Sequence, residues 1–312
     1  MEPKNIGYIG PGRMGSGIIK NLLKNDLKVV IFEHRHGLKL NDLKKLGASV
    51  TDSLLQLAKE NNTIMLTLPS SREVEQLILG KDGLLYNLKP GSVVIDLSTS
   101  LPSSTRMIAT KLSEKKIDML DAPMTGTPVH AQKGELTLMV GGKKKVYEEY
   151  LDIFRLIAKN IFYVGSVGSG HTVKLINNFL FLVNMAAISE ILPLVVKCGV
   201  DPDALYSVIL VSGGNSRAFE GNVPLICKRV FDILFTLNMA RKDLRYVAEL
   251  GQEHNVPLPM VNSALQVFDL AVAYGLADEN TSGLVKMWED IVGVTVESEG
   301  KQARNNGRIK NS

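Results

Sequence analysis

The sequence has little cysteine and no recognisable metal site. Its 312 residues include two cysteines, Cys198 and Cys227, too few to build a disulfide framework. No cluster of cysteine and histidine has the spacing of a zinc site. We therefore expect a protein without structural disulfides or a bound metal.

Secretion and membrane signals are also scarce. The first five residues lead directly into an apolar run, which leaves no room for a signal peptide. The longest apolar stretch, residues 179–196, is interrupted by Asn184, Ser189 and Glu190, so it predicts a buried helix rather than a membrane span. We expect a cytoplasmic protein with no membrane partner.

No charge of one sign dominates the chain. It has 36 basic and 32 acidic residues, and its longest basic run is residues 143–145. This balance gives little support to a nucleic-acid partner. The apolar content of 45% over 312 residues instead favours two globular domains.

Up to about residue 165, short apolar runs alternate with amphipathic stretches. Strands are predicted at residues 6–9, 28–32, 63–68, 92–97 and 117–120, and two more at 136–140 and 161–164. Helical patterns lie between them, at residues 14–24 and 143–158 for example. This alternation predicts a Rossmann-type, doubly wound parallel sheet, an α/β domain over residues 1–166.

The pattern changes after a Gly/Ser-rich segment at residues 165–170. From His171 onward we expect an all-α second domain over residues 167–297, which binds substrate and mediates dimerisation. Its first helix should run over residues 171–197, with Pro193 kinking or shortening it. Residues 298–312 are polar and should form a loosely held tail.

A glycine-rich turn follows the first predicted strand. Gly10, Gly12 and Gly15 form a G-x-G-x-x-G sequence that opens a helix, the arrangement that places a pyrophosphate at a helix N-terminus. Glu33 closes the next strand, where an acid binds the ribose 2′-hydroxyl of NAD. We predict NAD as cofactor, with NADP as the alternative if Arg35 turns inward to meet a 2′-phosphate.

Two further clusters carry polar groups. Lys174, Asn177 and Asn178 have the spacing of one helix face, just after the domain boundary; they form either an exposed stripe or part of a cleft. The segment 121–127 follows a predicted strand, where Thr125 and Gly126 can offer donors to an anion. By itself this segment is equally compatible with a simple turn.

Together these motifs resemble the β-hydroxyacid dehydrogenase family, which includes 3-hydroxyisobutyrate dehydrogenase and tartronate-semialdehyde reductase. The resemblance covers residues 6–292. It rests on the N-terminal fingerprint at 7–15, the D-x-S-T segment at 96–99, the D-A-P segment with the glycine-containing strand after it, the G-x-G-x-x-x-K-x-x-N-N segment at 168–178 and the K-D-L segment at 242–244.

The resemblance implies roles for individual residues. Lys174 matches the catalytic lysine, the general acid or base at the substrate carbonyl, with Asn178 orienting the substrate. The implied substrate-binding residues are Thr125, Gly126, Asn177 and Asn178. The implied cofactor-binding residues are Gly10, Gly12, Arg13, Met14, Gly15, Glu33, Leu68, Pro69, Thr99 and Lys242.

The implied activity is NAD(P)-dependent interconversion of a small β-hydroxy acid and its semialdehyde, by a homodimer or homotetramer. Thr125, Thr127 and His130 depart from the family's usual loop, so the sequence does not name the substrate. Two alternatives stay open: reduction of a C=N bond, as in imine reductases, and a non-catalytic dinucleotide-binding protein.

Overall fold

The computed structural model describes residues 5–33 and 40–298. The chain divides into two compact units, Met1–Leu175 and Ile176–Ser312. The division falls inside one helix, α9 (Ser169–Lys197), which begins in the first unit and continues into the second. Each unit is described separately below.

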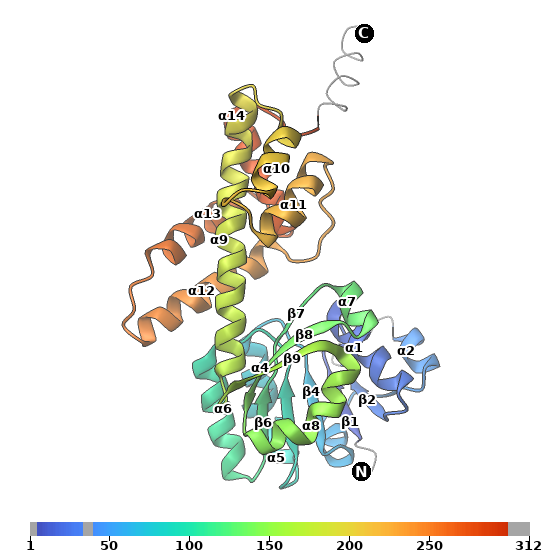
Figure 1. The fold of residues 1–312 in the computed structure, drawn as a ribbon. Helices are drawn as coiled ribbons and strands as arrows, with labels where there is room; N and C mark the ends of the chain where they lie inside the picture. The colour runs from blue at the N-terminus through green and yellow to red at the C-terminus, as the bar shows by residue number, and fades with distance from the viewer. Residues whose placement is uncertain (1–4, 34–39, 299–312) are drawn as a thin grey trace. The chain divides into compact units, whose positions relative to one another are not determined.

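The first unit is built on a nine-stranded sheet (Figure 1). Its strands are β1 (Ile6–Ile9), β2 (Val29–Phe32), β3 (Ser49–Thr51), β4 (Thr63–Leu66), β5 (Val93–Asp96), β6 (Asp118–Asp121), β7 (Met124–Thr125), β8 (Leu136–Gly142) and β9 (Ala158–Gly165). The order is β3-β2-β1-β4-β5-β6-β8-β7, with β9 also paired to β8. The run from β3 to β6 is parallel and has the Rossmann strand order.

This sheet confirms the predicted fold class and adds details that the sequence did not reveal. Strands β3 and β7 were not expected. Strand β8 is antiparallel to both β6 and β7, so the far edge of the sheet departs from the parallel arrangement. Such an added antiparallel edge is common on doubly wound sheets.

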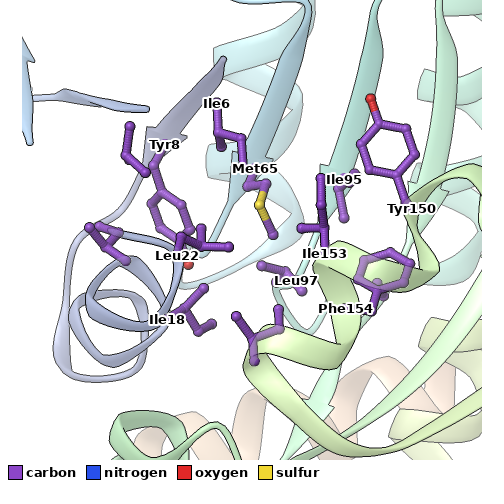
Figure 2. Close-up of a cluster of buried hydrophobic side chains, with 14 of the residues drawn as sticks. Ile6, Tyr8, Ile18, Leu22, Met65, Ile95, Leu97, Tyr150, Ile153 and Phe154 are labelled. Carbon is purple, nitrogen blue, oxygen red and sulfur yellow. The ribbon is translucent and has the colours of Figure 1, made fainter. Parts of the chain in front are cut away.

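Helices flank the strands of the first unit. They are α1 (Arg13–Lys24), α2 (Asn41–Lys45), α3 (Leu54–Glu60), α4 (Ser71–Leu79), α5 (Leu84–Asn87), α6 (Pro102–Glu114), α7 (Pro128–Lys133) and α8 (Lys144–Ile157). Side chains from β1, β4 and β5 meet those of α1 and α8 in one core, which Figure 2 shows around Tyr8 and Phe154. A second core contains alternate strand residues such as Ile64 and Val94, together with side chains of α3 to α6. The sheet therefore has an apolar core on each face, as a parallel sheet requires.

In its described part, residues 176–298, the regular structure of the second unit is helical, apart from one isolated bridge between Thr236 and Asn280. After α9 come α10 (Pro202–Leu210), α11 (Arg217–Cys227), α12 (Leu237–Glu253), α13 (Pro259–Ala273), a 3₁₀ turn η1 (Thr281–Gly283) and α14 (Leu284–Val292). Two apolar cores hold them together, one around Phe268 and the other around Phe219. The helical second domain is therefore confirmed.

Two features of helix α9 bear on what the sequence predicted for this segment. It continues through Pro193 to Lys197, so the proline does not shorten it. In the described part of the chain it is also the one helix whose length and composition would allow it to cross a membrane, with a mean hydropathy of 2.1 in its most apolar window, of which 39% is buried. The core helix of a soluble protein can have the same length and composition.

The last described residues contact the second unit. Val296 is fully buried in the core around Phe219, and the backbone N–H of Ser298 donates to the carbonyl of Cys227. The predicted tail begins at residue 298, and its remainder lies outside the described residues.

Candidate active site

The glycine-rich turn lies between β1 and α1, and its three glycines have different surroundings. Gly10 has a φ of +88°, and a Cβ there would lie 2.1 Å from the Thr67 carbonyl oxygen. A Cβ on Gly15 would lie 2.2 Å from the carbonyl oxygen of Gly10. A Cβ on Gly12 would meet nothing within 4 Å. Gly10 and Gly15 are therefore required by packing, whereas Gly12 leaves open space above the helix start.

The N-terminus of α1 has the electrostatic character of an anion site. Its N-cap is Gly12, and among the described residues no side chain caps the helix and no acidic residue occupies its first turn. The partial positive charge of the helix end is therefore not neutralised by an acid of its own. Arg13 is exposed and Met14 half-buried at this end. The arrangement fits a pyrophosphate, as in dinucleotide-binding folds.

Other predicted cofactor residues lie at the ends of neighbouring strands. Glu33 directly follows β2, is half-buried, and donates its backbone N–H to the Thr51 carbonyl. Leu68 and Pro69 follow β4, and the N–H of Leu68 donates to the Ser98 hydroxyl at 2.9 Å. Thr99 follows β5. The carboxyl ends of β1, β2, β4 and β5 share one edge of the sheet, the edge at which such sheets bind ligands; Arg35 lies outside the described residues.

The predicted anion-binding loop is partly a strand. Thr125 belongs to β7 and pairs with Thr137 of β8, and Gly126 follows it with a φ of +135°. Two of the residues that depart from the family's usual loop, Thr127 and His130, interact with each other. His130 Nδ1 lies 2.8 Å from the Thr127 hydroxyl and accepts the Thr127 backbone N–H at 3.1 Å, so these two residues form a reciprocal cap on α7.

Lys174 and Asn178 are the buried members of the polar cluster on α9. They are one turn apart and 9% and 8% exposed, whereas Asn177 is exposed. A lysine is rarely buried to this extent without a polar or charged environment. The two buried side chains therefore differ from the exposed stripe that was the alternative interpretation.

In the second unit, Asn178 is fixed by a residue that the sequence did not single out. Its side-chain N–H donates to Asp243 Oδ2 at 2.6 Å, and Asn177 donates to Asn178 Oδ1 at 3.2 Å. Asp243 is 2% exposed, and its Oδ1 lies 3.1 Å from Lys242 Nζ. The K-D-L segment thus contains both a predicted cofactor residue, Lys242, and the residue that anchors Asn178, Asp243. In the sequence, the only signal for Asp243 was its position next to Lys242.

In the first unit, Asp96 and Asp121 are also fully buried. They occupy paired positions at the ends of the adjacent strands β5 and β6. Asp121 accepts the backbone N–H groups of Gly168 and His171, at 2.8 and 2.9 Å, at the start of α9. Burial raises the pKa of the Asp121 carboxyl above its usual value, while the nearby His171 and the two N–H groups oppose this increase.

Among the described residues, no group of three or more His, Cys, Asp or Glu side chains could hold a metal ion.

Comparison with known proteins agrees with this geometry. Residues 5–165 match the model of the NAD-binding domain of 6-phosphogluconate dehydrogenase, and residues 168–288 match the NAD-binding domain of NADP-dependent 3-hydroxyisobutyrate dehydrogenase. The chain belongs to the 3-hydroxyisobutyrate dehydrogenase family. Members of this β-hydroxyacid dehydrogenase family are NAD(P)-dependent oxidoreductases.

Individual relatives cover nearly the whole chain. The 2-(hydroxymethyl)glutarate dehydrogenase of Eubacterium barkeri is 37% identical over 93% of this chain and 97% of its own. The L-threonate dehydrogenase of Cupriavidus necator is 32% identical over 92% and 97%. The crystal structure of a 3-hydroxyisobutyrate dehydrogenase from Salmonella typhimurium has a TM-score of 0.81 at 28% identity, covering 91% of this chain and 99% of that one.

Imine reductases share the fold at greater distance. That of Myxococcus stipitatus has a TM-score of 0.63 at 21% identity, covering 92% of this chain and 99% of its own. At this identity the likeness concerns the fold alone.

Proposed function

We propose that the protein interconverts a small β-hydroxy acid and its semialdehyde with a nicotinamide cofactor, and that Lys174 is the general acid and base. The observation that carries this proposal is the burial of Lys174 one turn before the buried Asn178 on α9. An ammonium group withdrawn from water and backed by a fixed amide is suited to bind a carbonyl oxygen on which negative charge develops.

In this mechanism a bound nicotinamide cofactor supplies or accepts the hydride. The Lys174 ammonium donates a hydrogen bond to the substrate carbonyl oxygen and transfers a proton as the alkoxide forms; in oxidation the neutral amine takes that proton back. Asn178, held by Asp243, orients the oxygen. Thr125 and Gly126 hold the acid group of the substrate, and Asn177, which donates to Asn178 Oδ1, also binds the substrate.

We assign cofactor binding to the strand ends of the first unit and to Lys242. The diphosphate is held at the N-terminus of α1 by the turn containing Gly10, Gly12 and Gly15, with Arg13 and Met14 alongside. Leu68, Pro69 and Thr99 line the path toward the nicotinamide. The Glu33 carboxylate accepts from a ribose 2′-hydroxyl and repels a 2′-phosphate, so we propose NAD as the preferred cofactor and NADP as the weaker one.

The names of the relatives support an acid as substrate, since they denote dehydrogenases of 2-(hydroxymethyl)glutarate and L-threonate. The test is to measure initial rates with NADH and NADPH over short aldehyde acids that carry a carboxylate, sulfonate or phosphate group. We expect turnover of carboxylate substrates, faster with NADH. Binding of both cofactors without turnover of any aldehyde acid would contradict the proposal and favour a dinucleotide-binding role.

Reduction of a C=N bond is the second candidate, because imine reductases share the fold over most of their length. The buried Lys174 favours the carbonyl substrate, since an ammonium stabilises an alkoxide directly. Cyclic imines belong in the same panel, and faster turnover of imines than of aldehyde acids would reverse this preference.

We also propose that the protein is a cytoplasmic homodimer or homotetramer, with no nucleic-acid or membrane partner. The second unit exposes several large apolar side chains, among them Leu180, Leu194, Val208, Val211, Leu270 and Ile291, and exposed apolar surface is typical of oligomer interfaces. Light scattering after size-exclusion chromatography should give a mass at least twice the 34.1 kDa of one chain. A monomer at micromolar concentration would contradict this assignment.

A further inference from the structure

The loop that follows β5, residues 97–101, is held from within by the carboxylate of Asp96. Asp96 Oδ1 accepts the backbone N–H of Ser98 at 2.9 Å, and Oδ2 accepts the hydroxyl of Ser100 at 3.2 Å. These three residues are buried, whereas Thr99, which lies between the two serines, is half-buried. The carboxylate therefore fixes the loop in a conformation that leaves Thr99, a predicted cofactor residue, partly exposed.

Two serine hydroxyls connect this loop to the loop that follows β4, residues 67–70. The backbone N–H of Leu68 donates to the Ser98 hydroxyl at 2.9 Å. In the opposite direction, the N–H of Leu101 donates to the hydroxyl of Ser71, the first residue of α4, at 2.7 Å. Ser98 and Ser71 are both buried. Each side thus supplies one backbone donor and one serine acceptor, and we call these two hydrogen bonds the serine bridges.

The serine bridges continue a connection that begins in the sheet. Strands β4 and β5 are parallel neighbours, paired up to Leu66 and Asp96, and the N–H of Leu97 donates to the Leu66 carbonyl at 2.9 Å. Beyond these residues the strands end and the loops begin. Backbone N–H groups beyond the strand ends still need acceptors, and the serine hydroxyls provide them. The two loops are therefore held to each other beyond the last bond of the sheet.

The first turn of α9 contacts the same loop. The carbonyl of Ser98 accepts from Nε2 of the buried His171 at 3.2 Å. The ring nitrogens of His171 lie 3.8 and 3.9 Å from the carboxylates of Asp96 and Asp121. His171 precedes Lys174 by three residues, about one turn of the helix. The loops joined by the serine bridges are thus connected to the helical turn that carries the proposed general acid.

We propose that Ser98 and Ser71 are positioning residues: through the serine bridges they hold Leu68, Pro69 and Thr99 as one unit, so that the nicotinamide end of the cofactor binds in one orientation. Both hydroxyls are buried and accept backbone N–H groups, so they act through the loops and not by contact with the cofactor. Hydride transfer depends on this orientation, since a misplacement of about 1 Å costs about 100-fold in rate. The inference rests on the cofactor role proposed for the two loops.

The first experiment tests, without cofactor or substrate, whether the two bridges act as a unit. Amide hydrogen exchange is measured by NMR on the full-length wild type, Ser98→Ala and Ser71→Ala. In Ser98→Ala, we expect exchange at Leu101, whose own acceptor remains, to accelerate about 3- to 10-fold, the effect of losing about one hydrogen bond. Exchange at Leu68 should accelerate in the same way in Ser71→Ala. Unchanged exchange at the remaining bridge in either folded variant would overturn the proposal.

The second experiment compares two ligands of the same proteins, NADH and ADP-ribose, which keeps the adenosine, diphosphate and second ribose but lacks the nicotinamide. In both serine variants, the Kd for NADH should rise about 3- to 10-fold. The Kd for ADP-ribose should stay within about 2-fold of the wild-type value, because the glycine-rich turn is untouched. A merely structural serine would weaken both ligands equally, and that result, or an unchanged Kd for NADH, would overturn the proposal.

The matched control is Ser92→Ala, which removes the same hydroxyl from the residue just before β5, at the other end of the strand. Ser92 is 1% exposed, and within the described chain its hydroxyl has no hydrogen-bond partner. Ser92→Ala should therefore leave exchange at Leu68 and Leu101, and both Kd values, at the wild-type level. Changes in Ser92→Ala as large as those in Ser98→Ala would show that any buried serine has this effect, and would overturn the proposal.

The outcomes separate this inference from the proposed function. If the wild type turns over no aldehyde acid, the proposed function fails, while exchange and binding still decide the role of the serines. If the wild type is active and the folded variants bind NADH as the wild type does, the positioning role is wrong and the function of Lys174 stands. If one serine variant does not fold, the other carries the same prediction. If neither folds, the bridges are required for folding and not for orientation, which refutes the proposal.

Discussion

Alanine at Gly12 and at Gly15 should separate cofactor binding from stability, although both glycines belong to one motif. At Gly15 the new Cβ would lie 2.2 Å from the Gly10 carbonyl oxygen, more than 1 Å inside ordinary contact. Overpacking of this kind costs about 1–3 kcal/mol, which exceeds the gain of up to about 1 kcal/mol from replacing glycine in a helix. We expect Gly15→Ala to lower the free energy of unfolding by about 1–2 kcal/mol.

Gly12→Ala should have the opposite pattern. Its Cβ meets nothing within 4 Å, and its φ of −72° suits any residue. The apo protein should unfold at the same urea concentration as the wild type. A methyl group in the space proposed for the pyrophosphate should nevertheless weaken NADH binding about 10- to 100-fold, or about 1.4–2.8 kcal/mol.

The assay is urea unfolding of the apo proteins, together with NADH titration followed by fluorescence. Wild-type affinity in Gly12→Ala would refute the assignment of this turn to the cofactor. Wild-type stability in Gly15→Ala would instead refute the packing argument.

Two further predictions concern stability and reactivity. Burial raises the pKa of the Cys227 thiol to about 11, so native protein at neutral pH should react with a thiol reagent at the exposed Cys198 and at Cys227 only after unfolding. Equal labelling of both thiols in the native protein would contradict the burial of Cys227. Because the folded state keeps the Cys227 proton at a pH where the unfolded thiol loses it, the contribution of Cys227 to the free energy of unfolding should fall as pH rises from about 9 toward about 11. Glu289 is 5% exposed, pairs with Arg229 and accepts the Val296 N–H. Glu289→Ala should therefore lower the free energy of unfolding in urea by about 2–4 kcal/mol, and Glu289→Gln should lower it less. An unchanged urea midpoint in Glu289→Ala would show that this contact contributes nothing to stability.

The parts of the fold that sequence analysis predicted are those determined by local pattern. A short, fully buried run, Ile6–Ile9, defines β1, and the glycines after it have a fixed order. Strands β3 and β7 were missed because they are three and two residues long, too short for a period to be visible. Pro193 does not end α9, which continues through it to Lys197, so of the two effects predicted for this proline, shortening did not occur.

The polar network around His171 illustrates what the sequence could not show. Asp96, Asp121 and His171 are far apart in the chain and meet because β5 and β6 are adjacent, in register and parallel. Each aspartate stood at the end of a predicted strand, which was the available signal. Nothing local, however, predicted that β5 and β6 are neighbours or that the first turn of α9 contacts their ends.

We propose that Lys174 transfers the proton. Its most direct test is Lys174→Ala, measured for turnover, NADH affinity and urea unfolding on one preparation, with Asn178→Ala as the comparison. We predict that kcat falls about 100- to 10,000-fold in Lys174→Ala, the usual contribution of a positioned general acid, and that Asn178→Ala loses less. Folding and NADH binding should be nearly unchanged, since the glycine-rich turn and the core around Tyr8 are separate from this side chain. Unchanged kcat in folded Lys174→Ala protein would show that Lys174 does not transfer the proton.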